Sequence, residues 1–217
     1  MKLIIVGIAI SFLGAALLIT AQDKKETYPG KPYRDARVSQ TPQVIPGRLV
    51  CAYYDVGGEG IAYHDTSGVN EGSGKLNPAD GSYLNEFRMK EGVDISYTKS
   101  WDFTAGNLVA PESLDMLYVG WTEPGEWLNY TIKVKKTGLY TVDFFYSAAV
   151  EASISLSVNG EDTTGSLVVP TTENPHQWNR INNFTEIYFK KGNHILTLHT
   201  KEKGLMNYMW FSFTLKQ

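Results

Sequence analysis

Residues 126–134 read EWLNYTIKV, and from Leu128 onward an apolar side chain stands at every second position of this stretch. Successive side chains of a strand point to opposite faces, so this alternation predicts a β-strand with one buried face. Thr137-Gly138 follows as a turn, and residues 139–146, LYTVDFFY, would return as the next strand. A strand, a turn and a second strand predict an antiparallel pair at the centre of the fold.

The same pattern continues toward the C-terminus. Residues 153–158 alternate and run into Asn159-Gly160, a dipeptide typical of tight β-hairpins. Residues 187–189 and 194–199 form another pair around Lys191-Gly192-Asn193, and residues 206–215 would make the last strand. Many short strands separated by turn residues predict an all-β protein, an antiparallel two-sheet β-sandwich of jelly-roll-like type.

Composition and charge exclude several classes of protein. The chain has 217 residues, of which 42% are hydrophobic, 20% are charged and 12% are aromatic. Such a chain can bury a core, which excludes a coiled coil or a fully disordered chain. A net charge of −3 gives no basis for binding nucleic acid, because phosphates need clustered cations. The single cysteine excludes an internal disulfide and a cysteine-based zinc site.

The N-terminal residues divide into two segments ahead of the domain. Residues 1–21 combine Lys2 with an apolar run from 3 to 19, which predicts a secretory signal peptide; a retained membrane anchor is the alternative. Residues 22–44 are polar and contain three prolines, which predicts a linker or extended arm. Residues 45–217 would then form the single domain, secreted, periplasmic or on the cell surface, with no membrane partner once the signal is removed.

Motifs for catalysis are sparse. The four histidines have no metal-binding spacing, no GxSxG motif is present, and Cys51 lies in the apolar run LVCA. Glycoside hydrolysis needs only two carboxyl groups, so acids remain as candidates. These are Glu59, Asp65, Asp94, Glu123 and Glu126. Their spacing does not show which of them meet, and we expect no enzymatic activity.

Four segments together resemble a family 6 carbohydrate-binding module. They are GGEGIAYHDT at 57–66, FRMKEGVDI at 87–95, VGWTEPGEWLNYT at 119–131 and MNYMWF at 206–211. The resemblance covers about residues 45–215 and implies a β-sandwich with a galactose-binding-like fold. It also implies recognition of a polysaccharide or oligosaccharide in a cleft at the loop end of the sandwich.

The resemblance places the family's cleft residues on Glu59, Phe87 and Asn207. Trp178 corresponds to the second tryptophan of a later loop, while the stacking tryptophan of that loop falls near His176. These residue types suit a sugar, because an aromatic ring packs on the C–H face and amide or carboxylate groups pair with hydroxyls.

The tryptophan missing near His176 could be replaced by Trp101, which lies in an inserted region. Large aromatic residues dominate the core of a small sandwich, so Trp121, Trp127 and Trp210 are expected in the core.

Two departures from the family pattern change what is expected. The family's first strand carries two glutamates that help to hold a structural calcium, but this chain has Val50-Cys51-Ala52 there. Calcium needs six to eight oxygen ligands, so we expect no calcium at that position and no other cofactor. Residues 68–86 and 97–116 are insertions, which could line the cleft or cover a sheet edge.

These observations favour a secreted, non-catalytic carbohydrate-binding protein, which could associate with polysaccharide-degrading enzymes. One alternative is a structural or assembly β-sandwich that has lost sugar binding, because a fold does not dictate a function. A glycan-active hydrolase that uses the acids named above is the other alternative.

Overall fold

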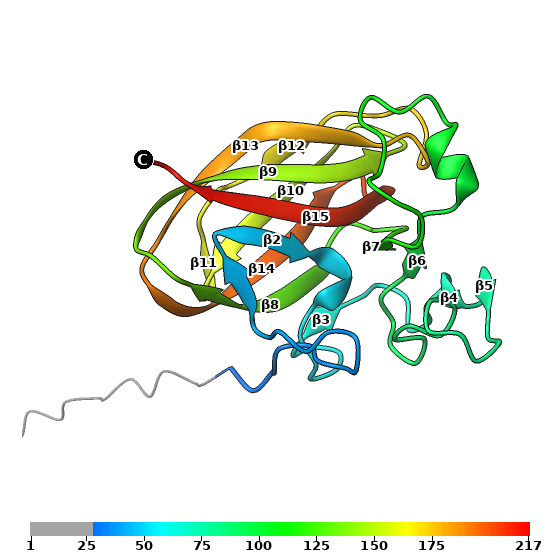
Figure 1. Cartoon of the computed structure of the whole chain (residues 1–217), viewed down its shortest axis with the longest axis horizontal. Coiled ribbons are helices and arrows are strands. Elements are labelled where there is room, and N and C mark those ends of the chain that lie inside the picture. Colours follow the sequence, from blue (N-terminus) through cyan, green and yellow to red (C-terminus); the bar gives the residue numbers. More distant parts are fainter. Residues whose placement is uncertain (1–27) are drawn as a thin grey trace, which may run out of the picture.

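The computed structural model describes residues 28–217, so the predicted signal peptide lies outside the described residues. Two β-sheets pack face to face, with the long strands of each running side by side (Figure 1). This confirms the predicted all-β sandwich. The predicted pairing of residues 126–134 with 139–146, and of 187–189 with 194–199, is wrong, because the two members of each pair lie in different sheets and the turn between them crosses from one sheet to the other.

The first sheet has the order β1-β8-β14-β10-β11, with β3 paired to β8 and β12 paired to β10. Its strands are β1 (Gln43–Ile45), β3 (Tyr63–His64), β8 (Trp127–Val134), β10 (Ala152–Val158), β11 (Glu161–Asp162), β12 (Leu167–Val169) and β14 (Gly192–Glu202). All pairings are antiparallel except that of β1 with β8, which is parallel.

The second sheet has the order β13-β9-β15-β7-β6, with β2 paired to β15. Its strands are β2 (Gly47–Val50), β6 (Ile95–Tyr97), β7 (Leu117–Val119), β9 (Gly138–Ala148), β13 (Asn179–Phe189) and β15 (Met206–Leu215). The described chain also has a small parallel pair, β4 (Ser73–Gly74) with β5 (Asn77–Pro78), and two short 3₁₀ helices, η1 (Cys51–Tyr53) and η2 (Ser100–Phe103).

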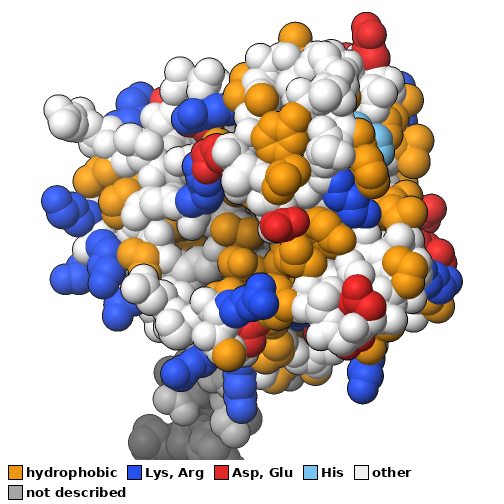
Figure 2. Space-filling model, turned by 45° about the vertical axis from the view of Figure 1, so that its right-hand side comes forward, with side chains coloured by type: hydrophobic (Ala, Val, Ile, Leu, Met, Phe, Trp, Pro, Cys, Tyr) orange, Lys and Arg blue, Asp and Glu red, His pale blue; other side chains and the backbone are white. Residues whose placement is uncertain are grey.

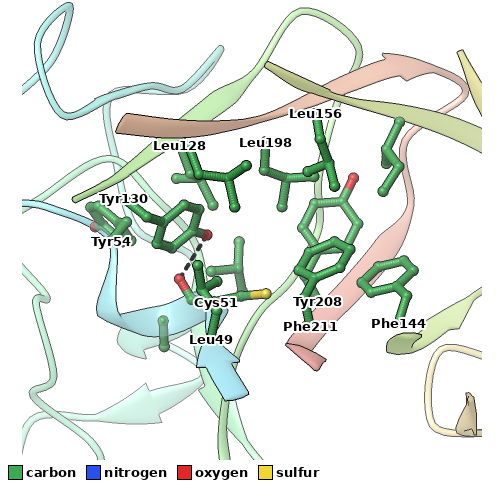
Figure 3. Packing of buried hydrophobic residues seen from close by; sticks show 14 of the residues in the cluster. Leu49, Cys51, Tyr54, Leu128, Tyr130, Phe144, Leu156, Leu198, Tyr208 and Phe211 are labelled. Carbon is green, nitrogen blue, oxygen red and sulfur yellow. Dashed lines mark hydrogen bonds between the residues drawn. The ribbon is translucent and has the colours of Figure 1, made fainter. Parts of the chain in front are cut away.

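The core lies between the two sheets and follows the alternation read from the sequence. In β8, Leu128 and the three alternate residues after it are buried. Leu128 and Tyr130 lie beside Leu198 and Leu196 of the neighbouring strand β14. From the second sheet, Phe144 stacks on Phe211 with ring centroids 4.3 Å apart. Figure 3 shows these residues converging from both layers. Burial of this much apolar surface is the main favourable term in folding.

The segment Val50-Cys51-Ala52 ends β2 and begins the 3₁₀ helix η1. Cys51 and Ala52 are fully buried there, and the backbone carbonyl of Cys51 accepts a hydrogen bond of 3.0 Å from the Tyr130 hydroxyl (Figure 3). Burial raises the pKa of the Cys51 thiol, which keeps it protonated. This segment therefore belongs to the apolar core.

The predicted arm lies against the sandwich over its described residues. Lys31 pairs with Val56 through backbone hydrogen bonds of 2.8 and 2.9 Å, and Tyr33 packs against Tyr53 and Phe87. The strand β1 begins at Gln43, two residues before the predicted domain boundary. The contacts show that residues 28–44 pack on the sandwich as an arm, one of the two forms expected for this stretch.

Both insertions lie at one end of the sandwich, on the right of Figure 1. The first contains β4 and β5, and the buried Asn70 Oδ1 accepts hydrogen bonds from three backbone N–H groups that shape it. The second contains η2 and is tied to the sheet where Arg48 of β2 binds Glu112 through two hydrogen bonds of 2.6 and 2.8 Å. The predicted insertions are thus ordered parts of the loop end.

Candidate functional site

Asn207 joins three segments at the loop end of the sandwich. Its Nδ2 donates to Ser147 Oγ at 3.0 Å and to the Pro175 carbonyl oxygen at 2.7 Å. On its other side, a Cβ built on Gly120 would lie only 2.7 Å from Asn207 Oδ1, so the residue there must be small. Asn207 is 7% exposed and its amide donors are used within the chain. It therefore positions the loops, and both donors of the amide that was expected to bond a sugar are bound within the chain.

A buried carboxylate anchors the inserted segment to the loop beside Asn207. Asp102 is fully buried and accepts hydrogen bonds from His176 Nδ1 at 3.0 Å, Trp178 Nε1 at 3.0 Å and the Lys99 backbone N–H at 2.8 Å. Burial alone would raise the pKa of Asp102, but these bonds outweigh it and lower the pKa, the bond from His176 most of all. The carboxylate therefore stays ionised and holds η2 against the 174–178 loop.

This anchoring creates a shallow depression of about 450 Å³. Its lining consists of Trp101, Thr104, Ala105, Asn174 and His176. The Trp101 ring is half exposed and meets the His176 ring edge-on, with centroids 6.3 Å apart and planes at 83°. Figure 2 brings this end of the molecule forward and shows hydrophobic side chains at the surface with a histidine among them. An exposed indole beside amide, hydroxyl and imidazole groups provides both features that a pyranose requires.

A second exposed indole stands on the opposite side of Asn207. Trp121 follows Gly120, is 39% exposed, and has a backbone φ of 50°. That left-handed conformation is unfavourable for a residue with a side chain, and it persists only where the neighbours enforce it. The next residue, Thr122, supplies this restraint: it is buried, its Oγ1 donates to the Met206 carbonyl at 3.2 Å, and its carbonyl accepts from Leu205 N at 2.6 Å. Trp121 is therefore held outward, contrary to the expected core position.

Two of the predicted aromatic contacts are wrong, because the rings are buried. Phe87 is 3% exposed and packs against Tyr33 of the N-terminal arm, Tyr53 and Tyr83 at centroid distances of 5.3–6.0 Å. The arm thus occupies the face of Phe87 that a sugar would need.

Trp178 is fully buried and stacks on Phe145 with centroids 5.6 Å apart and planes at 5°. Its indole N–H is bound to Asp102 and its backbone N–H to Asn107 Oδ1 at 2.7 Å. It supports the depression from below. Trp210 is buried, as expected, whereas Trp127 is only partly buried.

Glu59 belongs to a separate, acidic part of the loop end. It is exposed, pairs with His64 Nδ1 and accepts a hydrogen bond of 3.1 Å from the Asp65 backbone N–H. Glu59, Phe87 and Asn207 share no hydrogen bond and line no common depression, so the structure does not assemble the predicted trio.

Two of the candidate acids, Glu123 and Glu126, meet at Thr66. The Thr66 hydroxyl contacts Glu123 Oε2 at 2.5 Å and Glu126 Oε1 at 2.9 Å. Burial, with the nearby charge of Asp65, raises the pKa of Glu126 to about 7. Burial also raises the pKa of Asp94 to about 6, and Asp65 adds to that effect. These carboxylates are held by threonine and backbone donors of the same loops.

Another depression, of about 360 Å³, lies where the arm, both insertions and β15 meet. Arg48 stacks over the Trp210 ring at 4.2 Å and Arg37 over the Tyr83 ring at 4.0 Å. Because Arg48 is also bound to Glu112, internal contacts hold the wall of this depression. It marks the junction of these segments.

Sequence reasoning named His176 but assigned its stacking partner only as a possible substitute, and it missed Trp121. Their position in the sequence could have indicated that these tryptophans are exposed. Trp121 lies in a turn-forming stretch, GWTEPG at 120–125, and Trp101 lies outside every alternating strand. An aromatic residue in a turn has no sheet face to bury it.

Known structures share this fold. The chain is similar to a β-1,3-glucan-binding family 6 module from Bacillus halodurans, with a TM-score of 0.51 and 15% identity over 79% of this chain and 97% of that one. It is also similar to a family 6 module from Clostridium stercorarium solved with cellobiose, with a TM-score of 0.47 and 11% identity over 80% of this chain and 97% of that one.

No curated protein matches the chain. Within residues 28–217, no helix has the length and apolar character needed to cross a membrane. The family model described as carbohydrate binding module (family 6) matches residues 94–215, which is more than half of the chain. That span includes the long strands β8 and β9, both exposed tryptophans and Asn207. The protein therefore belongs to the family 6 carbohydrate-binding modules.

Proposed function

We propose that this protein binds a polysaccharide or oligosaccharide at the loop end of the sandwich, without cleaving it, and that it does so outside the cell. The observation that carries the proposal is the half-exposed Trp101 ring in the wall of the 450 Å³ depression. Trp101 would pack on the C–H face of a sugar ring, and Asn174 and His176 would bond its hydroxyls.

Trp121 supplies the other aromatic surface. Asn207 contacts both loops, through the Pro175 carbonyl on one side and Gly120 on the other. It would therefore hold the loop beside Trp101 and the loop that carries Trp121 at a fixed distance from each other. A shallow site with two outward rings suits a chain of sugars, with affinity increased by contacts at more than one ring. The apolar run of residues 3–19 supports export.

The decisive experiment is a glycan array probed with the purified protein, followed by affinity gel electrophoresis on the glycans retained. Neutral β-glucans belong among the first probes, because the similar module from Bacillus halodurans binds β-1,3-glucan. Retention that is lost in Trp101→Ala would support the proposal. Binding to no glycan would favour a structural or assembly role. Release of reducing ends would instead favour a hydrolase built on the acids around Thr66.

A further inference from the structure

His176 is the titratable side chain in the lining of the Trp101 depression, and its ring orientation is defined. The imidazole Nδ1 lies 3.0 Å from Asp102 Oδ1, and the side chain is 41% exposed whereas that of Asp102 is 1% exposed. The ionised Asp102 can only accept, so Nδ1 carries the hydrogen of this bond. The second nitrogen, Nε2, has no hydrogen-bond partner among residues 28–217 and is left for solvent or a ligand.

The protonation state of Nε2 decides which groups it can bind. In neutral His176, Nε2 is an acceptor, because the one ring hydrogen is on Nδ1. In protonated His176, Nε2 becomes a donor. A sugar hydroxyl both donates and accepts, so it can bond either form. A carboxylate or sulfate only accepts, so it can bond only the protonated form.

Charge acts in the same direction. With neutral His176, the pair carries the negative charge of Asp102, which repels an anionic ligand, although the Lys99 ammonium interacts with the same carboxylate. Protonation of His176 makes a neutral ion pair and supplies a charge-assisted donor. The remaining groups near the pair do not replace it. Lys99 Nζ is bound to Asn77 and lies 5.3 Å from the Trp101 ring, the exposed Glu173 stands on the same loop as His176, and the underlying Ser147 and Asn207 are uncharged.

We propose that His176 and Asp102 make this site selective for acidic saccharides under mildly acidic conditions and for neutral saccharides above that range. Histidine is the side chain whose charge most often changes near neutral pH, and an NMR titration measures where the His176 ring does so. The inference rests on the proposed function, because it names the class of sugar that the same depression takes. Asp102 acts through His176 as a positioning residue.

The test compares two probes of equal length and linkage, a β-1,4-linked glucose tetramer and the corresponding glucuronic acid tetramer, by titration calorimetry at about pH 5 and about pH 8. The uronate is ionised at both values, so a change in its binding reports on the protein. The expected result is a gain of about tenfold in the ratio of acidic to neutral affinity at the lower pH, the size of one charge-assisted hydrogen bond in an exposed site.

Two variants isolate the origin of the effect. His176→Gln keeps a donor for Asp102 and removes the titration, so its affinity ratio should be the same at both pH values. His64→Gln is the matched control, because His64 is also paired with a carboxylate, that of Glu59, but lies outside the depression. It should behave as the parent does. Thermal melts show that each variant is folded, and an NMR titration of the His176 ring in the parent reports its protonation directly.

The outcomes separate this inference from the proposed function. If the glucose tetramer binds but the affinity ratio stays constant with pH, or changes equally in His176→Gln, the inference is overturned and sugar binding stands. If neither tetramer nor any other glycan binds at either pH, the proposed function fails, and this inference fails with it.

Discussion

The side-chain amide of Asn207 donates a 2.7 Å hydrogen bond to the carbonyl oxygen of Pro175, which links the start of the last strand to the loop that carries His176. The same carbonyl accepts a 2.6 Å bond from Ser147 Oγ, and Asn207 also donates to that hydroxyl. Three polar groups are thus satisfied together beneath the depression. The site is held from the end of the β-sheet and does not depend on the loop alone.

Replacing Asn207 by alanine should loosen the 174–178 loop. The Pro175 carbonyl would lose one of its two donors and the buried Ser147 hydroxyl would lose its donor, so we expect the free energy of unfolding to fall by about 2 kcal/mol. Glycan binding should weaken, because His176 and Asn174 would no longer be fixed. Urea denaturation and affinity electrophoresis measure the two effects. Asn182→Ala, an exposed asparagine on β13, is the control and should change neither. Unchanged stability in Asn207→Ala would contradict the role assigned to this amide.

Removing the exposed indole should abolish most binding while the fold stays intact. Trp101→Ala leaves the core untouched, since the ring is half exposed, so the melting temperature should stay within about 2 °C of the parent value. The dissociation constant for a retained glycan should rise at least about tenfold, as is usual for the loss of a stacking aromatic. Phe103→Ala in the same short helix is the matched control, because Phe103 is 38% exposed but does not line the depression. Equal losses in both variants would argue against a defined platform.

The N-terminal arm should contribute to stability. Tyr33 stacks on Tyr53 with centroids 5.7 Å apart and donates a 2.5 Å hydrogen bond to Asp35, which also accepts from Tyr83 at 2.7 Å. We expect Tyr33→Ala to cost about 2 kcal/mol through lost packing and to speed proteolysis within residues 28–42. Tyr188→Ala, which removes a 58% exposed ring on β13, should cost far less. Limited proteolysis followed by mass spectrometry detects arm release; equal cleavage rates would show that the arm contacts are weak.

The acidic cluster predicts a dependence of stability on pH. The folded-state pKa of Glu126 is about 7 and its ordinary value is 4.5, so between these values the folded chain binds more protons than the unfolded chain. Stability therefore falls as the pH rises through this window. Glu126→Gln removes the titration, so the melting temperature of the variant relative to the parent should be higher at about pH 8 than at about pH 5. A difference that is constant or reversed across the two values would show that Glu126 is not destabilised by its surroundings.

Calcium should be dispensable at the first strand. The family's acidic ligands are replaced by Val50-Cys51-Ala52, and the structure buries Cys51 and Ala52 in the core. A chelator such as EDTA should therefore leave the melting temperature unchanged, because two charged oxygen ligands are missing. Differential scanning calorimetry with and without added calcium measures this. A drop of several degrees on chelation would mean that other oxygens of the chain hold the ion.

Local patterns explain why the strands were predictable and parts of the site were not. The alternation from Leu128 and the Asn159-Gly160 turn depend on neighbours in sequence, and the structure confirms the strand at 127–134 and the hairpin of β10 with β11. The partner of β8 is β14, more than fifty residues away, and this long-range choice of partner was not predictable from the local pattern. Burial of Phe87 depends on Tyr33, more than fifty residues away, and no local pattern reports such a contact. The same holds for Asp102, whose partner His176 belongs to another loop.

The order of residues by itself determined the sandwich, because alternating apolar side chains and glycine-containing turns leave few ways to bury the core. It also determined the family, because the motifs that identify it are short contiguous segments of the sequence. Only the tertiary structure decided which aromatic rings face water. That outcome depends on long-range packing: the arm covers Phe87, the sheet buries Trp178, and the loop backbones hold Trp101 and Trp121 outward.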